Sequence, residues 1–223
     1  MLETTGQLFV VATPIGNLGD ISARAKDILS SVQLVLCEDT RVTAKLMAAL
    51  EIRPSLQSFH EHTDAMKRKQ LVDRLVAGEK MALVTDAGTP AISDPGGFLV
   101  ADAVAAGVTV TPIPGASAVI AALSVSGFPI DRFTFVGFPP HKKGRQTFFK
   151  ELGEIDHATV LYESTHRIMK TLEALKGLGR QLMVGRELTK LHETIYRGSA
   201  DDVMRQIEAT SSKGEFVIVI APR

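Results

Sequence analysis

Cysteine, net charge and long apolar runs are all scarce in this chain of 223 residues. Its single cysteine, Cys37, excludes an internal disulfide and any metal site built from several cysteines, and it suits a reducing compartment. No apolar run approaches the roughly 20 residues that span a bilayer. The N-terminal MLETTGQLFVV lacks the basic region of a secretory signal. We therefore expect a cytoplasmic protein without a membrane segment.

Net charge is absent because 25 basic and 25 acidic side chains cancel. No overall field then attracts the chain to nucleic acid, so such contacts must depend on local clusters of cations. The sequence also lacks repeats at solenoid spacing, low-complexity tracts and flexible linkers. Apolar residues make up 45% of the chain, enough for the core of one large domain or two small ones.

Short apolar runs alternate with helical patterns through the first half of the chain. Strands are predicted at 8–12, 34–37, 81–85 and 108–113, with a weaker one at 55–59, and helices at 21–31, 40–50, 63–77 and 94–106. This alternation is typical of an α/β fold with a parallel sheet and helical crossovers.

The pattern changes after a helix predicted within 114–127. Strands follow at 133–138, 158–162, 181–188, 192–198 and 216–220, and helices at 143–152, 164–177 and 200–209. Three strands after residue 180 with one helix among them indicate a hairpin and thus a mixed sheet. We expect two α/β domains, 1–113 and 114–223, with a cleft between them.

The most informative segment is TDAGTPAISDPG, residues 85–96, which directly follows the apolar run MALV. Ligands bind at the carboxyl ends of strands in open α/β sheets, and glycine lets the backbone approach a ligand closely. Its prolines stiffen the loop. We expect Asp86 to accept hydrogen bonds from a polar small molecule, the alternative being a turn or cap residue.

A second loop, TPIGNLGDIS at 13–22, follows the first strand and opens a helix capped by Asp20 or Ser22. It has the position of a phosphate-binding loop. However, it lacks the P-loop lysine, and Gly16 and Gly19 do not match the dinucleotide spacing. Binding of a nucleoside triphosphate or NAD is therefore disfavoured, and a purely structural turn is the alternative.

Six motifs in order carry a family resemblance: ATPIGNLGDIS, CEDTR at 37–41, TDAGTPAISDPG, IPGASA at 113–118, YESTHR at 162–167 and RELTKLHETIYRG at 186–198. Together they resemble the tetrapyrrole methylase superfamily. Within it they resemble the group that methylates a cytidine ribose 2′-hydroxyl of small-subunit ribosomal RNA with S-adenosylmethionine.

The resemblance implies two αβα domains, a homodimer, and S-adenosylmethionine in the cleft between the domains. It implies ribosomal RNA or the immature small ribosomal subunit as partner. The residues it assigns to the cofactor are Pro14, Asp86, Ala87, Gly88, Ile92, Ser117, Ala118, Tyr162 and Glu163.

Methyl transfer to a ribose hydroxyl depends mostly on alignment of the reacting atoms, and a general base adds to the rate. Six acidic or basic residues stand near predicted strand ends, and the sequence does not choose among them: Glu38, Asp39, Asp94, Glu163, His166 and Glu187. EDTR equally suits a local ion pair and helix cap, and Arg167 equally suits pairing with Glu163.

Local cations supply the candidates for RNA phosphate contacts, with HKKGR at 141–145 projecting from a loop after two prolines. The residues assigned to RNA are Arg41, Lys142, Lys143, Arg145 and Arg167. KRK at 67–69 is interpreted as a solvated helix face. HEH at 60–62 lacks a third metal ligand, so we expect no metal. The phenylalanines of 128–140 favour core packing over a nucleobase platform.

Two other functions remain open from the sequence. One is methylation of a precorrin-like tetrapyrrole, which would use the same fold and cofactor. The other is a catalytically silent module that binds RNA or the ribosome.

Overall fold

The structure is a computed structural model that describes residues 6–60, 63–94 and 96–223. The chain forms two compact units, Met1–Ser117 and Ala118–Arg223. The two units divide after Ser117. The sequence predicts the boundary after residue 113. The PGA turn belongs to the first unit, and Gly115 lies so close to Ala12 that a Cβ added to it would lie 3.0 Å from the Ala12 Cβ. The predicted cleft between the two halves stays a prediction.

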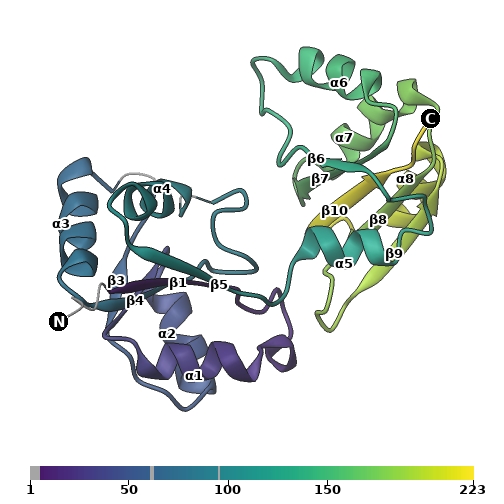
Figure 1. Cartoon of the computed structure of the whole chain (residues 1–223). Helices are drawn as coiled ribbons and strands as arrows, with labels where there is room; N and C mark the ends of the chain where they lie inside the picture. The colour runs from purple at the N-terminus through teal and green to yellow at the C-terminus, as the bar shows by residue number, and fades with distance from the viewer. Residues whose placement is uncertain (1–5, 61–62, 95) are drawn as a thin grey trace. The chain divides into compact units, whose positions relative to one another are not determined.

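The first unit contains five parallel strands, β1 (Gln7–Val11), β2 (Leu34–Cys37), β3 (Leu56–Ser58), β4 (Lys80–Leu83) and β5 (Thr109–Ile113). They lie in the order β3-β2-β4-β1-β5 (Figure 1). The predicted parallel sheet, including its weak strand, is confirmed. β2 is buried along its whole length, as expected for an inner strand of a parallel sheet.

Four α-helices and a short 3₁₀ helix connect these strands: η1 (Leu18–Asp20), α1 (Ala23–Ser31), α2 (Thr40–Ala49), α3 (Ala65–Val76) and α4 (Gly97–Ala105). α1 and α2 pack on one face of the sheet, and α3 and α4 pack on the other (Figure 1). Ser22, Asp39 and Asp64 cap α1, α2 and α3 by accepting backbone N–H bonds.

The strand order creates a switch point between β1 and β4. The chain leaves β1 through α1 on one face, and it leaves the neighbouring β4 through α4 on the opposite face. The loops after these two strands therefore diverge at the carboxyl edge of the sheet, which is where ligands bind in open α/β folds.

The second unit contains a mixed sheet of β6 (Phe133–Phe135), β7 (Ala158–Ser164), β8 (Leu182–Arg186), β9 (Thr194–Gly198) and β10 (Glu215–Ile220). The order is β6-β7-β10-β8-β9. Only β6 and β7 run parallel, and β8 and β9 form the predicted hairpin. The expected mixed sheet is confirmed.

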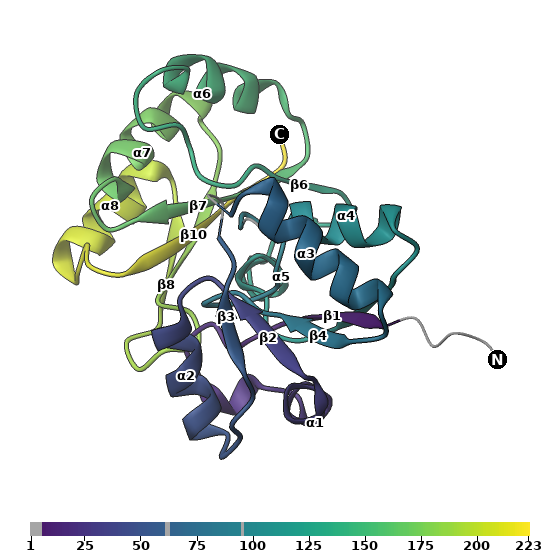
Figure 2. The same ribbon diagram turned by 90° about the vertical axis from the view of Figure 1, so that its left-hand side faces the viewer.

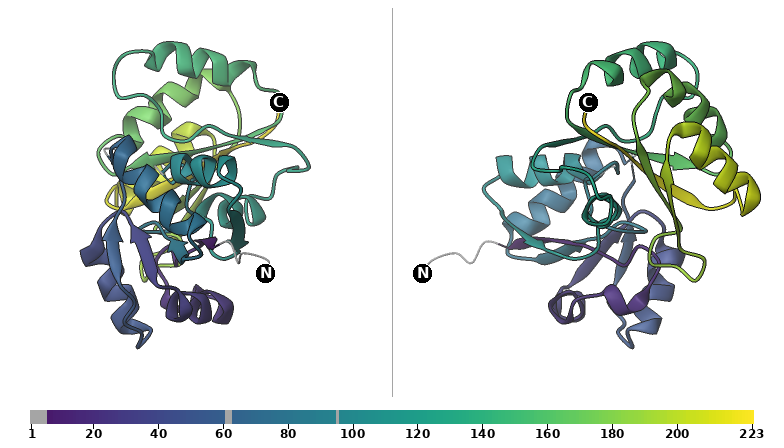
Figure 3. Two further views of the ribbon diagram at one scale, coloured as in Figure 1. Left: turned by 60° about the vertical axis from the view of Figure 1, so that its left-hand side comes forward. Right: turned by 90° about the vertical axis from the view of Figure 1, so that its right-hand side faces the viewer.

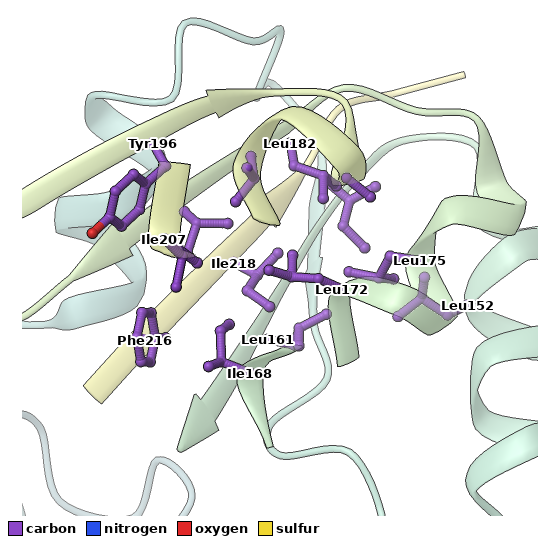
Figure 4. Packing of buried hydrophobic residues seen from close by; sticks show 14 of the residues in the cluster. Leu152, Leu161, Ile168, Leu172, Leu175, Leu182, Tyr196, Ile207, Phe216 and Ile218 are labelled. Carbon is purple, nitrogen blue, oxygen red and sulfur yellow. The ribbon is translucent and has the colours of Figure 1, made fainter. Parts of the chain in front are cut away.

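Its helices are α5 (Ala118–Ser124), α6 (Arg145–Glu154), α7 (Ile168–Leu175), η2 (Lys176–Leu178) and α8 (Ala200–Ala209). Figures 2 and 3 show α6, α7 and α8 together on one face of the sheet, where they enclose the apolar core in Figure 4. α5 packs on the other face, against β7, β8 and β10. Among the residues described, no helix is long and apolar enough to cross a membrane.

Gly6 enters the first sheet where no side chain fits. Its N–H donates to the Leu75 carbonyl at 2.9 Å. A Cβ added to Gly6 would lie 2.0 Å from the Glu79 carbonyl oxygen, which is backbone and cannot turn away. We expect Gly6→Ala to lower the free energy of unfolding by about 1–3 kcal/mol, the usual cost of overpacking. The measurement is the urea midpoint.

Gly97→Ala is the matched control in the same unit. Its added Cβ meets only the Ala91 Cβ, at 3.9 Å, so we expect a change within about 0.5 kcal/mol. Equal midpoints for the Gly6 variant and wild type would show that the backbone around Glu79 yields.

Candidate functional site

The loops after β1 and β4 are joined by backbone pairing at the switch point. Thr13 N–H donates to the Gly88 carbonyl at 2.9 Å, and Gly88 N–H donates to the Thr13 carbonyl at 3.1 Å. The buried Thr13 hydroxyl also donates to the Thr85 carbonyl at 3.1 Å. Thr13 was not among the predicted site residues, although its place at the end of a buried strand was a usable signal.

Gly88 has φ of +87°, in the left-handed region that favours glycine. A Cβ there would lie 3.4 Å from Ile15 Cγ2 and 3.8 Å from the Ala116 carbonyl. The next residue, Thr89, donates its hydroxyl to the same Ala116 carbonyl at 3.2 Å. The loops after β1, β4 and β5 thus meet around one glycine.

Asp86 joins the loop after β2 to this group. Asp39 N–H donates to Asp86 Oδ1 at 3.3 Å, while the Asp86 side chain stays exposed. Partial burial raises the pKa of Asp86 above its ordinary value, and the charge of Asp39 adds to the rise. The edge of the sheet therefore presents an exposed carboxylate held by a neighbouring backbone amide.

The other residues assigned to the cofactor in the first unit surround this edge. Pro14 and Ser117 are half-buried, and Ala87 and Ile92 are exposed. The structure therefore places all six first-unit candidates, Asp86 and Gly88 included, on the loops that follow β1, β4 and β5.

Asp94 shapes the loop instead of facing outward. Its Oδ1 accepts N–H bonds from Ala91 and Gly96, both at 2.9 Å. Ala91 and Ser93 have φ of +67° and +63°, a conformation that costs energy for residues with a Cβ. Oδ1 thus holds the backbone of this loop, whereas the buried Oδ2 has no hydrogen-bond partner in the part of the chain that the structure describes. The role of Asp94 as a base stays a prediction.

The EDTR motif adopts its structural alternative at Asp39. Asp39 caps α2 and pairs with Arg41 at 2.7 Å. The hydrogen bonds from Arg41 lower the pKa of Asp39 to about 2, which makes it a weak proton acceptor at neutral pH. Glu38, the neighbouring candidate, is exposed.

In the second unit, Glu163 is fully buried and bonded on both carboxylate oxygens. Oε1 pairs with Arg167 Nε at 2.9 Å and accepts the Ser164 N–H at 2.7 Å, and Oε2 accepts the Thr171 hydroxyl at 2.5 Å. The side chain is thus buried and both of its oxygens accept hydrogen bonds within the fold, and the roles of Glu163 as base and cofactor ligand stay predictions. Breaking such a buried pair typically costs about 3–5 kcal/mol.

Two arginines assigned to RNA belong to the same buried cluster. Arg167 donates to the Pro139 carbonyl at 2.8 Å, and Arg145 donates to the Pro140 carbonyl at 3.2 Å and to the Thr171 hydroxyl at 2.7 Å. Their guanidinium groups are therefore engaged within the fold. Thr171, which links them, was not predicted, since a threonine on a helix face carries no distinct signal.

Glu187 is likewise engaged. Although burial raises its pKa, the Glu215 N–H at 2.8 Å and the Lys190 ammonium at 3.0 Å hold the pKa of Glu187 below its ordinary value. The loop that follows β8 also has left-handed residues at Glu187 and Thr189. Among the other base candidates, Glu38 is exposed after β2 and His166 is exposed in the turn between β7 and α7.

Aromatic residues gather where β6 meets β7. Tyr162 is half-buried, and burial raises its pKa although a backbone hydrogen bond from Val119 opposes the shift. Its ring lies 4.9 Å from that of Phe135 and 5.4 Å from that of Phe138. Core packing was the favoured prediction for these phenylalanines. It is wrong for Phe133 and Phe138, which are 41% and 51% exposed.

The two basic segments differ in their pairing. In KRK, Lys67 donates to the Ser58 carbonyl, Arg68 pairs with Asp102 and Lys69 pairs with Asp73. In HKKGR, the exposed side chains of Lys142 and Lys143 have no ion pair in the described parts of the chain. Only the second segment offers cations that the fold leaves to a ligand.

The HEH segment is only partly visible, because residues 61 and 62 lie outside the described residues. His60 N–H donates to the Thr63 hydroxyl at 2.9 Å. Within the ranges that the structure describes, no three His, Cys, Asp or Glu side chains form a group that could hold a metal ion.

Comparison with curated proteins shows long, nearly full-length similarity. The ribosomal RNA small subunit methyltransferase I of Xylella fastidiosa is 46% identical over 225 residues, which cover 98% of this chain and 82% of that protein. The protein of the same name from Synechocystis sp. is 46% identical, covering 97% and 79%. That from Escherichia coli O157:H7 is 42% identical, covering 98% and 78%.

Comparison with solved structures supports the fold. A cobalt precorrin-4 methyltransferase matches with a TM-score of 0.71 at 18% identity, over 98% of this chain and 95% of that one. Uroporphyrin-III-C-methyltransferase from Thermus thermophilus matches with a TM-score of 0.64 at 18% identity, over 97% and 94%. The family model of tetrapyrrole (corrin/porphyrin) methylases matches residues 7–204. The chain therefore belongs to the tetrapyrrole methylase family, whose members transfer a methyl group from S-adenosylmethionine.

Proposed function

We propose that this protein methylates a cytidine ribose 2′-hydroxyl in small-subunit ribosomal RNA, using S-adenosylmethionine. The observation that carries the proposal is the 42–46% identity, over 96–99% of the chain, to relatives named ribosomal RNA small subunit methyltransferase I. We place this activity in the cytoplasm, on ribosomal RNA or the immature small subunit.

The carboxyl edge of the first sheet fits the methyl donor chemically. S-adenosylmethionine carries an ammonium group, hydroxyls and a sulfonium cation, all of which a carboxylate such as Asp86 attracts or accepts. Gly88 allows close approach of the backbone, because it has no Cβ and is held at φ of +87°. We propose that the donor is held by Pro14, Asp86, Ala87, Gly88, Ile92 and Ser117. Contacts from Ala118 and Tyr162 stay a prediction of the family resemblance.

The donor, when bound, supplies an electrophilic methyl group. The chain then has to orient the donor and the ribose hydroxyl, and to remove the proton of that hydroxyl. The Thr13–Gly88 pairing keeps the loops after β1 and β4 in place before binding, so little ordering remains to be done. We retain Glu38 and His166 as candidates for the base that takes the proton of the ribose hydroxyl, a role worth about 10²–10⁴ in rate.

We also propose that the protein is a homodimer formed through α4. Phe98 and Val104 on this helix are 63% and 59% exposed, and Ala101 and Ala105 add exposed apolar surface between and beside them. The cation beside this apolar stripe, Arg68, lies 5.7 Å from the centroid of the Phe98 ring and pairs with Asp102 at 3.0 Å, so it is already engaged within the fold. A second copy of the same surface would bury the stripe.

Methyl transfer itself tests the proposed function. The assay uses tritiated S-adenosylmethionine and small subunits from a strain lacking the modification. We expect label in the RNA at one cytidine, whose phosphodiester linkage then resists cleavage by alkali. Label only on a free precorrin-like tetrapyrrole would favour the alternative reaction. Binding of RNA without donor binding or label would favour a silent module.

Asp86→Asn tests the donor site. The variant keeps the shape of the side chain and loses its charge, so we expect the Kd for S-adenosylmethionine to rise about 10-fold or more, the effect of roughly 1.5 kcal/mol or more for a charged hydrogen bond. Calorimetry supplies the Kd. Asp73→Asn, which alters an exposed α3 carboxylate, is the control. An unchanged Kd for Asp86→Asn would place the donor elsewhere.

Phe98→Glu tests the dimer. A buried charge in the proposed interface opposes association, so we expect the molar mass from light scattering to fall from two copies to one. Leu191→Glu, at an exposed leucine far along the sequence, should leave the mass unchanged. A wild-type monomer at micromolar concentration would refute the proposal.

A further inference from the structure

The loop between β6 and α6, residues 136–144, carries an exposed aromatic ring and two exposed lysines. Phe138 stands near its start, half exposed, and Lys142 and Lys143 follow after two prolines. Figure 1 shows this loop leading from β6 to α6. Aromatic rings beside clustered cations are what single-stranded RNA requires, since bases stack on rings and phosphates pair with cations.

The Phe138 ring is supported by contacts among aromatic side chains. Phe138 lies 5.4 Å from Tyr162 at an interplanar angle of 55°, and Tyr162 lies 4.9 Å from Phe135 at 65°. These tilted contacts use the edge or one face of each ring. Phe138 therefore has a supported position and still leaves half of its surface to solvent.

The same loop is also held by the Glu163 cluster, which consists of Glu163, Arg167, Thr171 and Arg145. Arg167, paired with Glu163, donates to the Pro139 carbonyl, and Arg145, bonded to Thr171, donates to the Pro140 carbonyl. Pro139 and Pro140 lie between Phe138 and the two lysines in the sequence. Because the loop is already ordered, binding would cost little conformational entropy.

We propose that an unpaired nucleobase of the substrate RNA stacks on Phe138 while Lys142 and Lys143 contact the neighbouring phosphates. This inference rests on the proposed function and specifies how its RNA is held. Two functions of the buried Glu163 cluster then follow from one arrangement: it stabilises the second unit, and it positions this loop. The two arginines of the cluster act as positioning residues and do not contact the RNA phosphates.

The test is RNA affinity by fluorescence anisotropy, with a short cytidine-rich single strand as probe. Loss of one stacked base corresponds to roughly 5- to 150-fold weaker binding. We expect a loss in this range for Phe138→Leu, which keeps the apolar bulk without a ring. Phe138→Tyr, which keeps the ring, should bind like wild type.

Two companion measurements separate base stacking from phosphate binding. The double variant Lys142→Ala with Lys143→Ala should lower the salt slope by roughly 0.7 for each phosphate that the lysines neutralise in wild type, whereas Phe138→Leu should leave the slope unchanged. A strand made abasic throughout should bind wild type and Phe138→Leu equally well.

Several results would overturn the inference. Wild-type RNA affinity in Phe138→Leu would show that no base stacks there, and an equal loss in Phe138→Tyr would show that the ring is not what matters. A matching loss of S-adenosylmethionine affinity would assign the ring to the donor. If wild type transfers methyl groups to RNA in these cases, the proposed function stands. If wild type labels no RNA, the proposed function fails whatever Phe138 does.

Discussion

The backbone pairing of Thr13 with Gly88 is the constraint on which the first unit's site depends. β1 and β4 are neighbours whose chains depart to opposite faces of the sheet, so their loops would separate without a tie. The two reciprocal hydrogen bonds supply that tie, and they require a residue at φ of +87°, which only glycine adopts at little cost. Asp86 lies two residues before this glycine. Asp39 N–H donates to Asp86 and the Thr89 hydroxyl donates to the Ala116 carbonyl, so the loops after β2 and β5 are bonded to the same loop.

The second unit uses its charged residues differently. Glu163, Arg167 and Arg145 stand in or near motifs that suggest catalysis or RNA binding, yet they bond to one another, to Thr171 or to the proline carbonyls of the β6–α6 loop. A charge without water must find partners within the fold, and these groups have found them. A motif of charged residues can thus serve a site indirectly, by holding the backbone that presents other side chains.

Secondary structure was predictable here because the patterns of apolar residues typical of helices and of strands are both strong. The four-residue apolar run of β2 and the alternating elements around it admit few arrangements other than a parallel sheet with helical crossovers. The sequence predicts the domain boundary after residue 113, and the compact units divide after Ser117. Gly115 lies close to Ala12, a neighbour about a hundred residues away in the sequence that local patterns do not reveal. The phenylalanines of the β6 region were assigned to the core because alternation cannot tell a covered face from an open one.

The sequence by itself determined the strands and helices, the loops that hold glycine and aspartate, and the family, because these depend on local pattern and on motifs that keep their order. Tertiary structure alone decided which carboxylates are bonded within the fold. Asp39 bonds to Arg41 and has a pKa of about 2, Glu163 is buried in a cluster, and Asp86 stays exposed with a raised pKa. Sequence shows each as an acid near a strand end. The charge, the hydrogen-bond partners and the access to water of each carboxylate depend on residues that only folding brings together.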